Sequence, residues 1–110
     1  QYTVITGVPM DTGTISNLGY DKKSNIFWIV NCDYLPVSYP GTGDIFASVL
    51  TGAFLSGDSL PIAMGKATCF AEECIKTTFS YSTDTRHGVM LEKVLAMPDH
   101  RFGTKPYSIL

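Results

Sequence analysis

Two glycines flank a threonine immediately before an apolar helical pattern in the stretch Tyr39-Pro40-Gly41-Thr42-Gly43-Asp44-Ile45-Phe46-Ala47-Ser48. Glycine lets the backbone adopt a positive φ angle and lets a ligand approach the main chain closely. The first turn of a helix presents N–H groups that lack helical partners, together with the positive end of the helix dipole. A glycine turn at this place therefore predicts an anion site of the kind that holds phosphate.

Asp44 is the charged residue of this turn and has two interpretations. A carboxylate in a first helical turn is favoured electrostatically, so helix capping is the simpler role. Beside a bound phosphate, the same carboxylate can accept the proton of an attacking hydroxyl group. The tetrapeptide Gly41–Asp44 alone leaves both roles open.

The segments before the turn predict strands. Tyr2–Thr6 is rich in β-branched and aromatic residues, which indicates a short buried strand that ends at Gly7, followed by a loop that reaches Thr14. Ile15–Tyr20 and Ile26–Cys32 then flank a polar turn, and this arrangement favours a β-hairpin. About three strands can be found in this way, and so small a sheet is consistent with part of a larger α/β sheet.

Two helices are expected after the turn. The first starts at Asp44 and ends before Gly57, and Ser59 can cap the second. The second helix carries small and apolar residues at helical spacing, which suits packing on a sheet. These residues are Ala63, Ala67, Phe70, Ala71 and Cys74. The charged residues of the same helix are expected to face water, namely Glu72, Glu73 and Lys76.

The remaining segments are irregular or short. Asp33–Pro40 is interrupted by prolines, and Tyr81–Arg86 is expected to be a polar loop. Val89–Leu95 is expected to form a last short helix, and the chain from Pro98 onward a loop or a terminal strand. The fold class predicted from these elements is α/β, with a β-hairpin and flanking helices.

Composition excludes several classes of protein. A net charge of −2 gives no basic surface for nucleic acid. Three cysteines, an odd number without paired spacing, argue against a disulfide framework and indicate free thiols in a reducing cytoplasm. No apolar stretch approaches the ~20 residues that cross a bilayer. We therefore expect a cytoplasmic protein without nucleic-acid or membrane partners.

The residues around the turn resemble a known family. Gly41-Thr42-Gly43-Asp44-Ile45-Phe46-Ala47-Ser48-Val49-Leu50-Thr51-Gly52 is similar to the pyridoxal kinase branch of the ribokinase superfamily. Val4-Ile5-Thr6-Gly7-Val8 resembles the family strand whose C-terminal end approaches ATP, and Asp84-Thr85-Arg86-His87-Gly88-Val89-Met90-Leu91-Glu92 resembles the tail of that branch. The resemblance implies that residues 1–110 form one domain, the C-terminal nucleotide-binding and catalytic portion of a longer kinase.

The resemblance also implies an activity. It is the ATP-dependent phosphorylation of the 5′-hydroxymethyl group of pyridoxal, pyridoxine or pyridoxamine, with Asp44 as the base. Gly41, Thr42 and Gly43 would form the anion hole for the transferred phosphate, and Thr6 and Gly7 would line the nucleotide site. Thr6 can equally be only a strand residue. ATP and Mg²⁺ are implied, with the Mg²⁺ ligands mostly outside this chain, and the parent enzyme is expected to be a homodimer.

Several alternatives remain. Sugar kinases of the superfamily usually carry alanine where Thr42 stands, and hydroxymethylpyrimidine kinases usually carry cysteine where Asp44 stands, so this sequence departs from both patterns. A non-catalytic nucleotide-binding remnant has no need of the Asp44 carboxylate. An oligomerisation domain would use an exposed sheet edge. On every kinase interpretation, the isolated chain is expected to be inactive, because most of the substrate pocket is missing.

Overall fold

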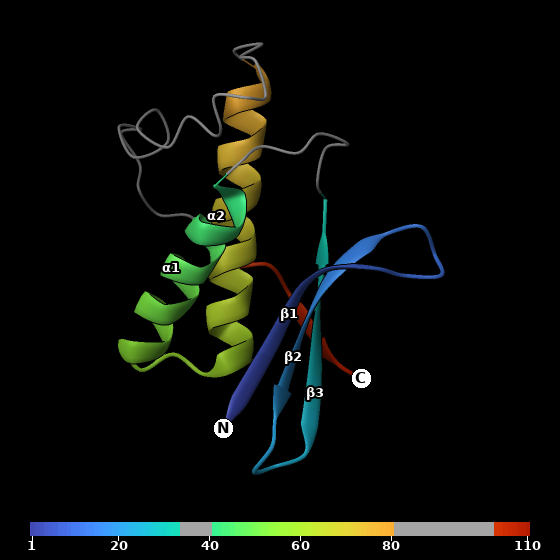
Figure 1. Cartoon of the computed structure of the whole chain (residues 1–110), viewed down its shortest axis with the longest axis vertical. Helices are drawn as coiled ribbons and strands as arrows, with labels where there is room; N and C mark the ends of the chain where they lie inside the picture. Colours follow the sequence, from blue (N-terminus) through green and yellow to red (C-terminus); the bar gives the residue numbers. More distant parts are fainter. Residues whose placement is uncertain (34–40, 81–102) are drawn as a thin grey trace.

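A four-stranded antiparallel sheet carries two helices on one of its faces in the computed structural model of the chain (Figure 1). The structure describes residues 1–33, 41–80 and 103–110. The strands follow the order β1-β2-β3-β4. Their bounds are Tyr2–Pro9 for β1, Ile15–Asp21 for β2, Ile26–Cys32 for β3 and Tyr107–Ile109 for β4. The helices are α1, Thr42–Leu55, and α2, Leu60–Ser80.

The expected hairpin is confirmed as β2 and β3, which pair from Ile15↔Cys32 to Asp21↔Ile26. Asp21 organises the turn between them. Its carboxylate accepts hydrogen bonds from the Lys23 N–H at 3.0 Å and from the Ser24 hydroxyl at 2.8 Å. These bonds, the one from Ser24 first, lower the pKa of Asp21. The polar turn therefore closes through its own side chains.

The expectation for the first strand was wrong in two respects. β1 does not end at Gly7 but continues to Pro9, because a bulge absorbs one extra residue where the pairing shifts between Ile5↔Leu18 and Val8↔Ser16. Nor is β1 buried, since it lies at the edge of the described sheet and six of its eight residues are exposed. β-branched composition indicates a strand but cannot tell a central strand from an edge strand.

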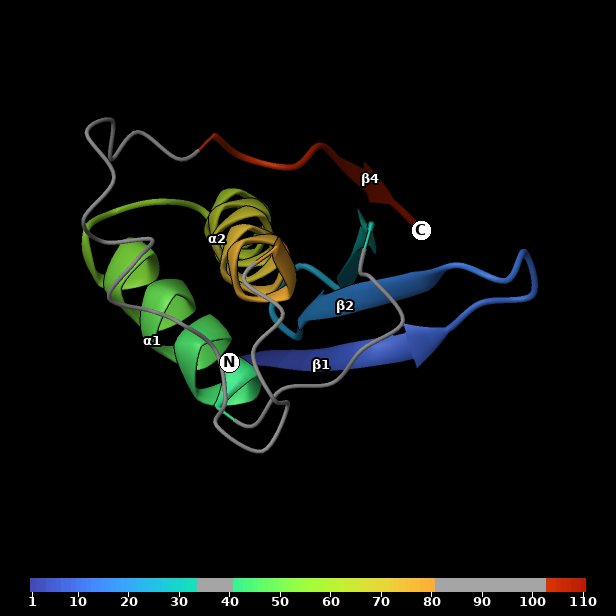
Figure 2. The same ribbon diagram turned by 90° about the horizontal axis from the view of Figure 1, so that it is seen from above.

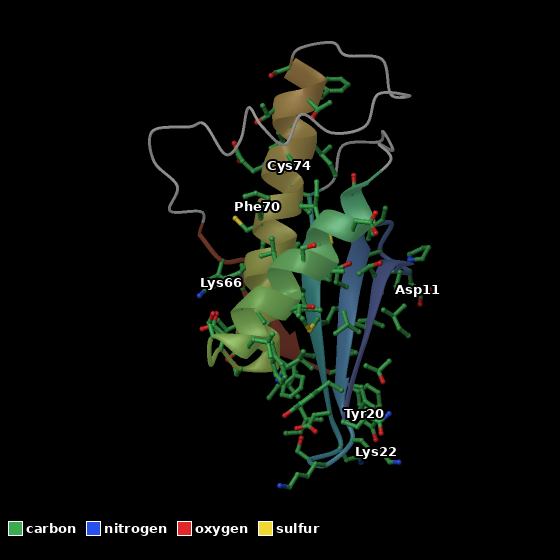
Figure 3. The ribbon with its side chains drawn as sticks, turned by 60° about the vertical axis from the view of Figure 1, so that its left-hand side comes forward. Asp11, Tyr20, Lys22, Lys66, Phe70 and Cys74 are labelled. Atoms are coloured by element: carbon green, nitrogen blue, oxygen red, sulfur yellow. The ribbon has the colours of Figure 1, made fainter. Side chains whose placement is uncertain are left out.

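α2 is the helix that packs on the sheet, and α1 packs on α2 (Figure 2). The expected stripe of α2 is confirmed, because all five of its small and apolar residues are buried. The core is centred on Met64 and Leu60 of α2 and Val30 of β3. Gly19 of β2 is required here, since a Cβ atom at that position would collide with the side chain of Met64. Figure 3 shows Phe70 and Cys74 along α2.

One expectation about α2 was wrong, because Glu72 does not face water. Its side chain is only 5% exposed and lies 3.0 Å from the ammonium group of Lys105. Burying a carboxylate is unfavourable unless a charged or hydrogen-bonding partner compensates, and here the partner comes from the segment just before β4. Lys76 is exposed, as expected, and Glu73 is half-buried.

The chain from Pro98 onward was expected to form a loop or a terminal strand, and its described part contains a strand, β4, which adds a fourth strand to the three counted from sequence. The irregular segment after Asp33, the polar loop Tyr81–Arg86 and the short helix Val89–Leu95 fall within residues 34–40 and 81–102, outside the described residues. Neither of the helices in the described ranges is long and apolar enough to cross a membrane.

Candidate functional site: the turn at the start of α1

Gly41 stands immediately before α1 in a left-handed conformation, with φ 90° and ψ −8°. Residues with a Cβ atom are strained in this region of the Ramachandran plot, so glycine is the residue that forms this entry to the helix at little cost. The first helical hydrogen bond runs from the N–H of Ile45 to the carbonyl oxygen of Gly41, 3.0 Å away. The N–H groups of Thr42, Gly43 and Asp44 therefore precede the regular bonding ladder of the helix.

No side chain caps this helix start. Asp44 lies in the first turn of α1 and is exposed, and within the described part of the chain its carboxylate forms no hydrogen bond. Asp44 therefore makes no capping hydrogen bond, while its place in the first turn fits the electrostatic preference for a carboxylate there, so both interpretations stay open. An exposed carboxylate beside a phosphate-type turn is in a position to meet a substrate hydroxyl group.

The turn opens to the surface. A Cβ atom on Gly41 or Gly43 would meet no heavy atom of the described residues within 4 Å. A tetrahedral anion can therefore approach the main chain, and the helix dipole favours negative charge there. This arrangement is chemically able to hold a phosphoryl group while a nearby carboxylate receives a proton.

Thr6 and Gly7 lie at the bulge of β1, not at its end, and both are exposed. Gly7 has a φ angle of 70°, and its N–H donates a 3.1 Å hydrogen bond to Oδ1 of Asn17. That N–H is consequently occupied within the fold. Figure 1 shows β1 running toward the end of the molecule at which α1 starts. Within the described residues, no hydrogen bond links the bulge of β1 to the glycine turn.

Asn17 is a buried polar residue that sequence reasoning missed. Its amide donates a 2.9 Å hydrogen bond to the hydroxyl of Thr68 on α2, while its carbonyl oxygen accepts the bond from Gly7. Asn17 thereby joins the bulge of β1 to the central helix. The signal in the sequence was an amide between Ile15 and Gly19, at the strand positions that face the helices.

Metal ligands were expected to lie mainly outside this chain. Among residues 1–33, 41–80 and 103–110, no three His, Cys, Asp or Glu side chains gather in a group able to hold a metal ion. Asp33 engages Lys105 at 2.7 Å, and Asp58, after α1, engages Lys66 at 2.7 Å. Magnesium prefers carboxylate oxygens and water, and no described residue is assigned to it.

Solved structures resemble the whole chain. A protein from Bacteroides thetaiotaomicron assigned as a phosphomethylpyrimidine kinase matches with 43% identity and a TM-score of 0.86, over 100% of this chain and 38% of its own. A second crystal form of that protein, with pyridoxal, gives a TM-score of 0.82 at the same identity. The pyridoxal kinase of Lactobacillus plantarum matches with 27% identity and a TM-score of 0.71, over 93% of this chain and 38% of its own.

More distant structures share the fold. The pyridoxal kinase of Leishmania donovani, in complex with ADP and pyridoxamine, has a TM-score of 0.81 at 23% identity, over 99% of this chain and 39% of its own. This chain therefore spans about two fifths of the length of the structures it matches. No family model and no curated protein matches it.

Proposed function

This chain has the fold of one part of a ribokinase-like kinase, and from that premise we propose that it supplies the phosphate-binding turn and the catalytic base of an ATP-dependent kinase for vitamin B6 compounds. The observation that carries the proposal is the turn itself. The left-handed Gly41 starts α1, no side chain caps the helix, and Asp44 follows in the first turn with an exposed carboxylate.

In the proposed reaction, Asp44 accepts the proton of the 5′-hydroxymethyl group of the substrate as its oxygen attacks the γ-phosphorus of ATP. The new O–P bond forms while the bond from the γ-phosphorus to the bridging β-phosphate oxygen breaks, and ADP leaves with that electron pair. The main-chain N–H groups of Thr42, Gly43 and Asp44 stabilise the charge on the transferring phosphoryl group. Gly41 sets the left-handed backbone conformation through which the chain reaches these groups at the start of α1.

Mg²⁺ would neutralise phosphate charge in this reaction, and its ligands are expected mostly outside this chain. Thr6 and Gly7 stay candidates for the nucleotide site, with Thr6 better suited because the Gly7 N–H already binds Asn17. The domain assignment, the C-terminal portion of a longer kinase, and the homodimeric state of that kinase stay predictions.

Two features support pyridoxal-type substrates. Thr42 and Asp44 together match the pyridoxal kinase pattern, and the 43%-identical Bacteroides protein was crystallised with pyridoxal. The same Bacteroides protein is described as a phosphomethylpyrimidine kinase. A hydroxymethylpyrimidine is therefore the competing class of substrate.

The test is a substrate panel on the complete kinase, with kcat/KM measured for pyridoxal, pyridoxine, pyridoxamine, hydroxymethylpyrimidine and ribose. We expect a B6 compound to be the best substrate. Hydroxymethylpyrimidine or ribose in first place would refute the substrate assignment, while leaving the role of the turn in place.

A further inference from the structure

Asn17 of β2 is a completely buried amide, with no exposed surface. Burying an amide is unfavourable unless its polar atoms find hydrogen-bond partners. Both polar atoms of this side chain have such a partner. Oδ1 accepts a 3.1 Å hydrogen bond from the Gly7 N–H of β1, and Nδ2 donates a 2.9 Å hydrogen bond to the hydroxyl of Thr68 on α2. Asn17 thus binds a strand on one side and a helix on the other.

The donors and acceptors of this network have one consistent order. The N–H of Gly7 can only donate, so the side-chain oxygen of Asn17 faces β1 and its nitrogen faces α2. The Thr68 hydroxyl donates its hydrogen to the carbonyl oxygen of Met64, 2.8 Å away, and accepts from Asn17 with a lone pair. The hydrogen bonds therefore connect the backbone of β1 to the backbone of α2, and each group in the series depends on the next.

Asn17 stands opposite the bulge of β1. The pairing of β1 with β2 shifts by one residue after Ile5, so that Thr6 and Gly7 together stand opposite Asn17. A bulge of this kind takes a backbone group out of the regular strand ladder. The side chain of Asn17 supplies the acceptor for the Gly7 N–H in place of a backbone carbonyl of β2. The buried amide therefore fixes the backbone of the bulge, where Gly7 has a φ angle of 70°.

The bulge also changes the surroundings of Thr6. In a regular antiparallel ladder Thr6 would pair with Asn17, and paired side chains lie on the same face of a sheet. In the structure Asn17 is fully buried against α2, whereas Thr6 is exposed. Bulges beside functional sites commonly re-aim a side chain in this way. The placement of Thr6, a candidate for the nucleotide site, thus depends on the bulge, and the bulge depends on Asn17.

We propose that Asn17 is a positioning residue for nucleotide binding, which holds the β1 bulge through the Gly7 N–H in the shape that presents Thr6 to ATP. This inference rests on the proposed kinase function. Because Asn17 has no exposed surface, it acts through the bulge and not by contact with the nucleotide. Its hydrogen bond to Thr68 ties the same bulge to α2, the helix against which α1 packs (Figure 2). One side chain thereby sets the nucleotide strand relative to the helical layer.

The experiment compares three variants of the complete kinase by titration calorimetry, with ATP and with pyridoxal. Asn17→Ala removes the acceptor of the Gly7 N–H and should weaken ATP binding about tenfold, with pyridoxal binding changed by less than about twofold. Thr68→Val removes only the anchor of Asn17 on α2 and should weaken ATP binding about threefold. Ser16→Ala is the matched control, because Ser16 is equally buried on β2 but bonds Asn31 of β3, 2.8 Å away. Its ATP affinity should stay within about twofold of the unmodified enzyme.

Amide hydrogen exchange of Gly7, followed by NMR in kinase that carries isotope-labelled glycine, is a second measurement that needs no substrate. The Gly7 amide should exchange slowly in the unmodified enzyme and in Ser16→Ala, and at least about tenfold faster in Asn17→Ala. An exchange rate that Asn17→Ala leaves unchanged would overturn the proposal. An ATP affinity that Asn17→Ala leaves intact, or that Ser16→Ala lowers equally, would also overturn it.

Circular dichroism establishes that each variant is folded. If Asn17→Ala does not fold, Thr68→Val decides, because faster Gly7 exchange with weaker ATP binding supports the proposal and the absence of both changes overturns it. Failure of the proposed function gives a different result. A complete kinase that phosphorylates another alcohol but not pyridoxal would reject the substrate assignment, while ATP affinity and Gly7 exchange would still test the role of Asn17.

Discussion

The backbone N–H of Asp33 donates a 2.7 Å hydrogen bond to the carboxylate of Glu72, 39 residues further along the chain. Lys105 completes the cluster, with its ammonium 2.7 Å from Asp33 and 3.0 Å from Glu72. Asp33 is the residue at which the chain leaves β3, and Glu72 belongs to α2, the helix on which α1 packs. This contact therefore ties the end of β3 to the helical layer that carries the glycine turn.

We expect Glu72→Ala to lower the free energy of unfolding by about 2 kcal/mol, because it leaves the Asp33 N–H and Lys105 without their buried acceptor. Urea unfolding followed by the fluorescence of Trp28 measures the change. Glu73→Ala is the matched control on the same helix, and it should change stability by about 0.5 kcal/mol or less. Equal losses for the two variants would show that the cluster does not stabilise the fold.

The ion pair of Asp33 predicts an acid-sensitive component of stability. The hydrogen bond from Lys105, and then its charge, lower the pKa of Asp33. A carboxyl group whose pKa is lower in the folded state stabilises the fold above its unfolded pKa of about 3.9, and this contribution is lost as the pH falls through the folded pKa. We therefore expect the free energy of unfolding to decrease below about pH 4.

In Asp33→Asn, the free energy of unfolding should fall less between neutral and acidic pH, since the asparagine does not titrate. Asp11→Asn removes the same charge from the connection between β1 and β2, so the difference between the two variants isolates the pair with Lys105. Urea unfolding at a series of pH values provides the measurement. If the free energy of unfolding of Asp33→Asn falls with pH as steeply as that of the unmodified chain, the Asp33–Lys105 pair is not the source of the acid sensitivity.

Asp44→Asn in the complete kinase should lower kcat by about 10²–10⁴-fold, because the amide cannot accept the proton of the substrate hydroxyl group. ATP binding, measured by calorimetry, should stay largely intact. Asp58→Asn is the control, since Asp58 lies beyond the other end of α1 in a surface pair with Lys66. Near-normal turnover of Asp44→Asn at neutral pH would exclude it as the base.

Gly41→Ala should weaken nucleotide binding, because a Cβ atom is disfavoured at a φ angle of 90° and the turn must change shape to relieve it. The strain at such a position is about 1–2 kcal/mol. Gly52→Ala, in the middle of α1 with open space around it, should be neutral or stabilising by up to about 1 kcal/mol. Isothermal titration with ATP compares the two, and equal affinities would mean that the turn does not hold phosphate.

The isolated chain should release no ADP in a coupled assay with Mg²⁺, ATP and pyridoxal. Phosphoryl transfer needs both substrates positioned together with metal-assisted charge neutralisation, and the described residues supply only the turn and the proposed base. Vitamer-dependent ADP release that Asp44→Asn abolishes would show that the 110 residues are sufficient.

The hairpin of β2 and β3 and both helices follow from neighbouring residues. The polar turn closes through Asp21, and the apolar spacing of α2 matches its buried face. Such features depend on contacts a few residues apart, so the sequence displays them directly. The bulge of β1 is different, because the extra residue between Ile5 and Val8 exists only relative to the register of β2.

The candidate site likewise has one part that the local sequence displays and one part that only the packing of distant segments creates. The glycine turn, with Asp44 in the first turn of the helix, could be located from residues 41–52 alone, and its role stays a prediction. Asn17 escaped notice because its partners, Gly7 and Thr68, meet only after the sheet and α2 have packed. A buried amide within a strand is recognised when both of its hydrogen-bond partners are known.

Residue types and their spacing thus specified a positive-φ glycine before a helix, a hairpin and a helix with one apolar face, since steric rules and local hydrogen bonds act within a few residues. Packing of distant segments decided that Glu72 is buried, since its partner Lys105 lies 33 residues away. Packing also decided that β1 is an exposed edge rather than a buried strand. Burial depends on which surfaces of the folded chain meet, and a strand pattern is the same whether one or both of its edges are paired.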